Sequence, residues 1–239
     1  MVEALEEMMR YNKIHPWDLK PVEAIELQKQ LREQVKIRPL DRPVSLVAGC
    51  DISFNKFSEV IYAGILVLRL PDFEVVERAT VVTETRFPYV PGLLSFRETP
   101  ALLEAWEKLS TAPDVVMLDG QGMAHPRRFG IACHFGLLTN TPALGCAKTV
   151  LVGKYAEPDE RAGGHSEMIH RGEVVGAAVR TKDRVSPVFV SPGHLIDLPG
   201  AIDVALRCVR GFPEKSKYRI PEPTRLAHLM VNELRRGEI

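Results

Sequence analysis

The sequence predicts an α/β protein with a mixed sheet of three antiparallel strands followed by parallel strands, flanked by helices. Three long β-rich runs follow one another in the first third of the chain with only short turns between them, which is typical of an antiparallel meander. The rest of the chain alternates helical patterns with short apolar runs, as α/β proteins do. One domain over residues 1–239 is sufficient, because 45% hydrophobic and 26% charged residues are an ordinary globular balance.

A helix is expected first, at about residues 21–36. Pro21 occupies a first helical position, and Val22, Ile25 and Leu31 are spaced as on a surface helix. The three strands of the meander follow as runs rich in β-branched residues, at 45–54, 59–70 and 73–84.

The later elements follow from the alternation of helix-like and apolar segments. They are a helix at 99–110, a buried strand at 114–120, a helix at 127–140, a strand at 142–148, a hairpin plus another strand within 167–197, and two closing helices at 201–211 and 222–236. The polar stretch 154–164 contains Gly and Pro, so it is interpreted as a surface loop.

The composition predicts a soluble cytoplasmic protein without a membrane partner. The longest apolar run, 61–68, is far shorter than the roughly 20 residues of a membrane helix, and the N-terminal "MVEALEEMMRYNK" is too acidic for a signal peptide. The four cysteines have no C-x-x-C spacing and lie mostly in apolar runs. Reduced thiols in the core are therefore expected rather than disulfides or a zinc site.

Charge is balanced overall and uneven along the chain. The 31 basic and 31 acidic residues argue against nucleic-acid binding by bulk charge. However, residues 120–156 contain four Lys or Arg residues and no acidic residue. This local excess is equally compatible with a surface that follows phosphates and with lysines and arginines that only favour solubility.

Two aspartates end or interrupt apolar runs. Asp51 follows "LVAGC" and Asp119 follows "VVML", and neither has a basic neighbour in the sequence. A buried unpaired carboxylate is unfavourable, although a single Asp at a strand end is often only a turn residue. If the strands at 45–54 and 114–120 are neighbours, the two carboxylates converge and Glu98 can reach them. Such a cluster predicts a site for Mg²⁺, or Mn²⁺ in its place, and metal-assisted phosphodiester hydrolysis.

Six motifs in order resemble those of the endonuclease V family: "GCDISF", "PYVPGLLSFRE", "DGQGMAHPRRFGIACHFGLL", "GCAKTVLVGK", "SPGHLID" and "IPEPTRLAH". The resemblance implies an RNase H-like fold and a DNA repair endonuclease that uses Mg²⁺ or Mn²⁺. Such an enzyme nicks deoxyinosine-containing DNA at the second phosphodiester bond 3′ to the lesion and leaves 3′-OH and 5′-phosphate ends. It also implies that Asp51, Glu98 and Asp119 bind the metal and that His228 of the closing helix approaches the site.

In that family the tip "PYVP" acts as a wedge that fills the space left by the flipped nucleotide. The matching residues are Pro88, Tyr89, Val90 and Pro91. The two prolines restrict the backbone, so an aromatic wedge can be inserted without first ordering the loop. The alternative is a tyrosine packed on the core.

A pocket for the flipped base is expected beside the wedge. Main-chain groups could accept hypoxanthine there, while the shape of the pocket excludes the 2-amino group of guanine. The residues expected to line it are four glycines and three apolar side chains: Gly92, Gly120, Gly122, Gly130, Leu94, Ile131 and Leu151. Each glycine taken alone is more often a simple turn residue.

Basic residues near Asp119 are expected to contact the DNA. His125, Arg127 and Arg128 are candidates for phosphate or catalytic-water contacts, and Lys148 for holding the scissile phosphate or the leaving oxygen. The expected partner is inosine-containing DNA, with RNA as an alternative, and a monomer is expected. A binder that does not cut and a generic RNase H-like nuclease are further hypotheses. The carboxylate set argues against the binder, and the wedge motif argues against the generic nuclease.

Overall fold

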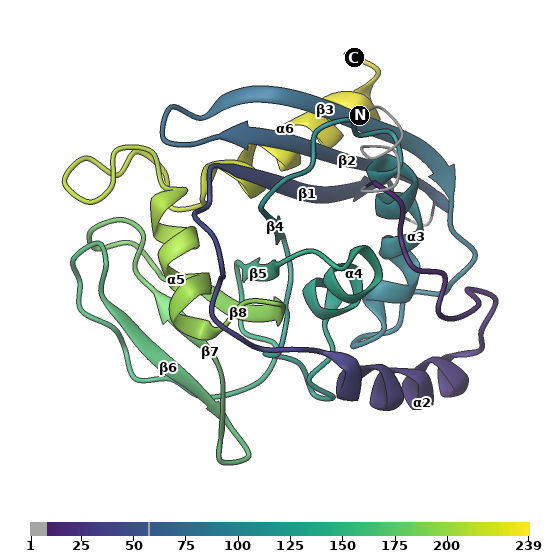
Figure 1. The fold of residues 1–239 in the computed structure, drawn as a ribbon, viewed down its shortest axis with the longest axis horizontal. Coiled ribbons are helices and arrows are strands. Elements are labelled where there is room, and N and C mark those ends of the chain that lie inside the picture. Colours follow the sequence, from purple (N-terminus) through teal and green to yellow (C-terminus); the bar gives the residue numbers. More distant parts are fainter. Residues whose placement is uncertain (1–8, 57) are drawn as a thin grey trace.

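A computed structural model describes residues 9–56 and 58–239, so residues 1–8 of the acidic N-terminal stretch and residue 57 lie outside the description. Its centre is one eight-stranded sheet with the order β3-β2-β1-β4-β5-β8-β7-β6 (Figure 1). The strands are β1 (Leu46–Phe54), β2 (Val60–Arg69), β3 (Glu74–Glu84), β4 (Val115–Leu118), β5 (Ala143–Ala147), β6 (His165–His170), β7 (Glu173–Val179) and β8 (Val188–His194). The helices are α2 (Pro21–Leu31), α3 (Leu94–Trp106), α4 (Ile131–Thr139), α5 (Leu198–Arg207) and α6 (Glu222–Arg236), and a 3₁₀ turn, Arg32–Gln34, follows α2.

The mixed sheet predicted from the sequence is confirmed, with fewer parallel strands than expected. β1, β2 and β3 form the antiparallel meander. β4 then pairs parallel to β1, and β5 parallel to β4. β8 pairs antiparallel to β5, and the β6–β7 hairpin continues the sheet from β8. The parallel pairing is therefore confined to the centre of the sheet, where β4 lies between β1 and β5.

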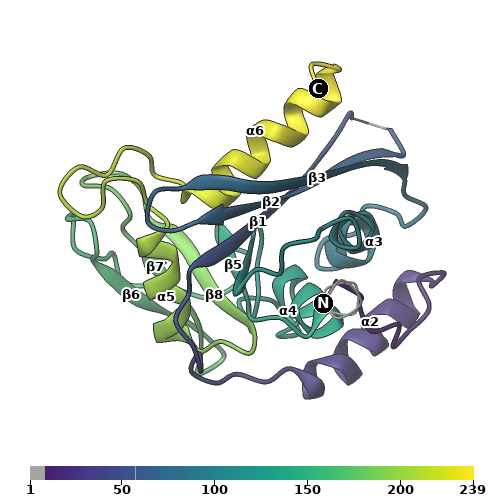
Figure 2. The ribbon, with the colours of Figure 1, turned by 45° about the horizontal axis from the view of Figure 1, so that its top comes forward.

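Helices cover both faces of the meander. Figure 2 shows α6 on one side of the three strands and α3 on the other. The alternation along β2 explains this, because Ile61 and Ile65 pack in the cluster under α3, whereas Leu66 and Leu68 pack with residues of α6. Gly49 of β1 allows the first turn of α6 to approach, since a Cβ atom there would lie 2.0 Å from the carbonyl oxygen of Pro223.

Helix α3 begins at Leu94, five residues before the position predicted from the sequence. The prediction placed Pro100 near the helix start, where proline is favoured, but in the structure Pro100 lies inside the helix. The extra turn contains Glu98, so this carboxylate lies early in the helix that follows the loop, as expected.

Two further expectations are tested by the fold. All four cysteines, Cys50, Cys133, Cys146 and Cys208, are free and buried, as predicted. Within residues 9–56 and 58–239, no helix is both long enough and apolar enough to span a membrane.

Candidate active site

Asp51 and Asp119 lie together because their strands are adjacent. Cys50 of β1 is opposite Leu118 of β4 in parallel register, so the next residue of each strand reaches the same point. A carboxylate oxygen of each aspartate and a ring nitrogen of His228 lie within 4.8 Å of one another. The convergence predicted from the two interrupted apolar runs is therefore present.

His228 is held in this cluster by α6 and by two polar neighbours. Its Nδ1 lies 2.7 Å from Oδ2 of Asp51, and this hydrogen bond raises the pKa of the imidazole above its ordinary value. Asn232, one turn further along α6, lies 3.2 Å from Nε2 and donates to the carbonyl of His228 at 2.7 Å. Asn232 was not among the predicted site residues, although its i, i+4 spacing from His228 indicates that the two side chains are neighbours on the helix.

Glu98 completes a group of three interacting carboxylates. Its half-buried position, together with the charges of Asp51 and Asp119, raises its pKa to about 8. Burial and Asp51 also raise the pKa of Asp119, while an ion pair with Lys148 opposes that shift. A divalent cation would relieve this repulsion, and carboxylate oxygens are the ligands that Mg²⁺ and Mn²⁺ prefer. The residues present thus fit such an ion.

Lys148 follows β5 and pairs with Asp119 at the edge of the cluster. Its carbonyl accepts a hydrogen bond of 2.9 Å from Arg219, which also donates to the carbonyls of Ser186 and Pro187. The backbone at Lys148 is therefore fixed while its ammonium group remains beside the carboxylates.

A pocket of about 390 Å³ opens next to Asp119 and Lys148. This volume lies within the range of about 300–1,000 Å³ that is usual for small-molecule sites. Six residues predicted for a base pocket line it: Gly92, Leu94, Gly120, Gly130, Ile131 and Leu151. Six lining residues were not foreseen, because nothing in their local sequence marks them: Ser95, Gln121, Phe129, Ala147, Thr149 and Val150.

Gly122 was predicted to line this pocket, but the structure places it elsewhere. It packs against β8, where an added Cβ would lie 2.0 Å from the carbonyl oxygen of Pro192. Its amide donates to Oγ of Ser191 at 2.8 Å. The absence of a side chain at Gly122 therefore serves the packing of the loop on the sheet.

The loop that contains Tyr89 stands at the rim of the pocket. Tyr89 is 65% exposed, which excludes the alternative that it packs in the core. Phe87 and Val90 anchor the loop in an apolar cluster with Ala24 and Phe96, whereas Pro88 and Pro91 are exposed. The loop thus presents an aromatic side chain from a fixed base.

The "HPRR" residues are more internal than predicted. Arg128 is buried and donates to Glu173, to the carbonyl of His170 and to that of His125, so its donors are used within the protein. His125 is also buried, and its ring nitrogens contact the carbonyl of Gly92 and the amide of Arg127. In this structure both side chains brace loops, and the phosphate contacts expected of His125 and Arg128 stay predictions.

A family model described as Endonuclease V matches residues 29–229. This chain belongs to the endonuclease V family. The endonuclease V of Myxococcus xanthus is 50% identical over 227 residues, which are 95% of this chain and 94% of that protein. The crystal structure of endonuclease V from Streptomyces avermitilis has a TM-score of 0.86 at 38% identity and covers 93% of this chain and 96% of that chain.

One similar structure that contains nucleic acid shows what an endonuclease V binds. It is that of Ciona intestinalis endonuclease V in complex with a 24mer DNA containing an inosine followed by a ribo-adenosine. Its TM-score is 0.76 at 27% identity, and the match covers 91% of this chain and 98% of that one. The predicted resemblance to endonuclease V, and the fold class that it implied, are confirmed.

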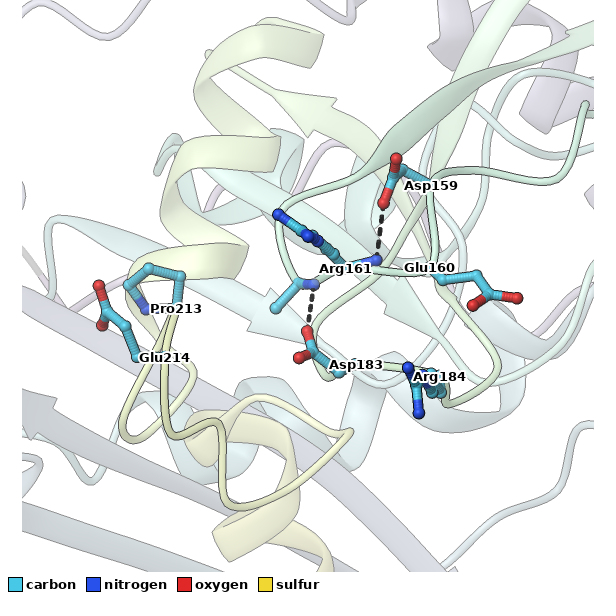
Figure 3. Close-up of a pocket in the computed structure, with 8 residues that line it drawn as sticks. Asp159, Glu160, Arg161, Asp183, Arg184, Pro213 and Glu214 are labelled. Atoms are coloured by element: carbon cyan, nitrogen blue, oxygen red, sulfur yellow. Dashed lines mark hydrogen bonds between the residues drawn. The ribbon is translucent and has the colours of Figure 1, made fainter.

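The protein has a second hollow, which is lined by none of the predicted site residues. It has a volume of about 970 Å³ and is lined by charged loop residues that include Asp159, Glu160, Asp183 and Arg184 (Figure 3). Asp159 accepts a hydrogen bond from the amide of Arg161, and Asp183 accepts one from the amide of Ala162. These two carboxylates thus stabilise turns, and we assign the hollow no function.

Proposed function

We propose that this protein is a DNA repair enzyme that cleaves DNA containing deoxyinosine, the product of adenine deamination. It hydrolyses the second phosphodiester bond 3′ to the lesion and leaves 3′-OH and 5′-phosphate ends. One observation carries the proposal: a pocket that opens directly beside the carboxylate cluster, with an exposed aromatic loop at its rim. The inosine-containing DNA bound by the Ciona relative supports the same substrate class.

Asp51, Glu98 and Asp119 would hold Mg²⁺ or Mn²⁺, with His228 next to them. When bound, such an ion supplies activation of water and stabilisation of the leaving oxygen. His228 holds a proton at Nδ1 against Asp51. Lys148, whose ammonium group lies beside Asp119, is placed to bind the scissile phosphate or the leaving oxygen. Arg127, which is half-buried, remains a candidate for a phosphate contact.

The damaged base would be read after it rotates out of the helix into the pocket. An inosine pair is weak, so opening it requires less free energy than opening a normal pair. Gly92, Gly120 and Gly130 would permit close main-chain contacts with hypoxanthine, while Leu94 and Ile131 supply apolar walls. Tyr89 would fill the gap left in the duplex.

A second candidate substrate is inosine in RNA. The Ciona relative was solved with a ribo-adenosine directly after the inosine, so a ribonucleotide at that position is compatible with binding in that protein. A binder that does not cut is less well supported, because binding alone does not require three adjacent carboxylates. For both substrates the protein is expected to act as a monomer in the cytoplasm.

Labelled duplexes with one inosine test the proposal. We expect cleavage of the inosine strand at the second phosphodiester bond 3′ to the inosine. Cleavage should occur in Mg²⁺ or Mn²⁺ and not in EDTA, and the matching duplex with adenine should stay uncut. RNA and DNA versions of the same strand separate the two substrate candidates through their dependence on the 2′-OH. Specific binding of inosine DNA without cleavage in either metal would instead support the binder.

A further inference from the structure

Helix α2 carries one buried polar side chain, Gln28, which is only 1% exposed. The other buried residues of the helix, Ala24 and Leu31, are apolar. Burying a carboxamide is unfavourable unless its donors and acceptor are all paired. The partners of Gln28 therefore indicate why a glutamine stands on the inner face of this helix.

All three partners of Gln28 belong to loops that flank the candidate base pocket. Its Nε2 donates to the carbonyl of Gly92 and to the carbonyl of Phe129, each at 3.1 Å. Its Oε1 accepts a hydrogen bond of 2.5 Å from Nε of Arg127. A single amide thus connects the N-terminal helix to two separate segments of the pocket wall.

The carbonyl of Gly92 is the centre of this polar group. It also accepts from Nη2 of Arg127 at 2.7 Å and from Nε2 of His125 at 3.0 Å. Because Nδ1 of His125 accepts from the amide of Arg127, its proton is on Nε2, which is the donor that Gly92 needs. Gly92 ends the exposed loop in a left-handed conformation, with φ of 79°. Hydrogen bonds to its carbonyl therefore fix the end of the loop.

The second carbonyl bonded by Gln28 belongs to Phe129. Phe129 lines the pocket and directly precedes Gly130 and Ile131, which line it as well. The Nε2 atom thus joins the base of the Tyr89 loop to the pocket segment that begins at Phe129. A change at Gln28 alters both walls without touching the carboxylates.

We propose that Gln28 is a positioning residue that sets the width of the lesion pocket and the seating of the Tyr89 loop. Through Gln28, helix α2 is part of the recognition apparatus and not only a cover for the core. This inference rests on the proposed function, since it concerns how the same pocket accepts an inosine from a duplex.

The test compares Gln28→Met with Gln30→Met, a matched change at an exposed position of the same helix. Methionine keeps the length and packing of Gln28 but removes its three hydrogen bonds. We expect single-turnover cleavage of an inosine duplex to fall about tenfold or more, as for loss of one hydrogen bond to a charged donor. Cleavage of a single-stranded inosine oligonucleotide should fall less, because no helix has to be opened. Gln30→Met should match the wild type on both.

Fluorescence anisotropy without metal gives a second measurement that does not depend on catalysis. Gln28→Met should bind the inosine duplex more weakly while its binding to the undamaged duplex is unchanged, so the ratio of the two affinities falls. Equal losses on duplex and single strand, or an unchanged affinity ratio, would overturn the inference. Such results would mean that Gln28 only stabilises the fold.

Gln28→Glu provides a variant that keeps the link to Arg127 and so does not depend on the folding of the methionine variant. Its carboxylate accepts from Arg127 but cannot donate to the carbonyls of Gly92 and Phe129. We expect the same selective loss on the duplex. A wild-type protein that cuts no inosine substrate would contradict the proposed function, whereas a cutting wild type with a fully active Gln28→Glu contradicts only the role of Gln28.

Discussion

Charge balance dominates the site at the scale of single residues. Asp51, Glu98 and Asp119 are three acidic groups in one cluster. The basic groups that act on them are Arg97, Lys148 and His228, of which His228 is exposed. Burial raises the pKa values of Glu98 and Asp119, and the charge of Asp51 raises both further. Function and stability therefore oppose each other at these positions.

Asp51→Ala and Asp119→Ala should each abolish cleavage without lowering the melting temperature. Loss of a group that only orients a metal ligand reduces affinity or activity by about 10- to 100-fold, so loss of a direct ligand should reduce activity by more than about 100-fold. Removing a carboxylate also relieves repulsion, so thermal stability is retained or increased. Single-turnover cleavage and thermal melting check both statements, with Asp72→Ala in the exposed β2–β3 turn as the control. A folded Asp51→Ala protein that nicks an inosine duplex at the wild-type rate would rule out this metal site.

Glu98 should make the metal-free protein less stable as the pH rises. Its pKa is raised from 4.5 to about 8 in the folded state, so between these values the folded protein holds a proton that the unfolded chain has released. The contribution of Glu98 to the free energy of unfolding is then lost progressively from about pH 4.5 to about pH 8. Glu98→Gln in EDTA should therefore melt higher relative to the wild type at about pH 8.5 than at about pH 5. The same difference in melting temperature between Glu98→Gln and the wild type at both pH values would contradict this expectation.

The element that distinguishes this site from a bare carboxylate cluster is the loop from Phe87 to Gly92. Phe87 is buried at its start, and the carbonyl of Gly92 is bonded at its end. Arg97 of α3 also donates to the carbonyl of Phe87 at 2.7 Å. Both ends are thus fixed, and Tyr89 extends from the segment between them.

Tyr89→Ala should leave the fold intact and impair engagement of the lesion. A surface truncation changes the free energy of unfolding by about 0.5 kcal/mol or less, whereas truncating a buried aromatic costs about 3 to 5 kcal/mol. The lost stacking should reduce affinity for the opened inosine duplex by about 1 to 3 kcal/mol. Melting temperature and single-turnover cleavage of duplex and single-stranded inosine substrates measure both effects. Equal impairment on the two substrates would show that Tyr89 is not a wedge.

At the scale of the whole molecule, the site is assembled from distant parts of the chain. Asp51 comes from β1, Glu98 from α3, Asp119 from the end of β4 and His228 from α6. These elements meet because β4 inserts parallel to β1 and because α3 and α6 pack against the meander. A metal ligand set that exists only in the folded chain links ion binding to global stability.

Mg²⁺ or Mn²⁺ should therefore raise the melting temperature of the wild type. An ion at 100 times its Kd stabilises the folded state by about 2.7 kcal/mol if it does not bind the unfolded chain. The Asp51→Ala/Asp119→Ala double variant should show no such shift, and EDTA should reverse the shift of the wild type. An equal rise in melting temperature for the wild type and the double variant would show that the ion binds at another site.

Features set by short-range pattern were predictable from the sequence. The three long strands were found because β-branched alternation is a local property, and the closing helix was predicted at 222–236, where α6 lies. Asp51 and Asp119 stood out because a charge that interrupts an apolar run is unfavourable without a partner. The exposed Tyr89 loop was marked by its two prolines, although the sequence alone left a core tyrosine open.

Only the tertiary structure decided which residues outside the strands face the site and which contact other parts of the protein. Gly122 faces β8, Arg128 is buried against the β6–β7 hairpin, and Gln28 reaches the pocket wall from the N-terminal helix. Each of these contacts joins segments that are far apart in the sequence, and local spacing carries no information on which distant backbone groups will become neighbours. The local sequence around Arg128 does not show whether its guanidinium binds a phosphate or a protein carbonyl. Its partner is determined only when the β6–β7 hairpin packs beside it in the folded protein.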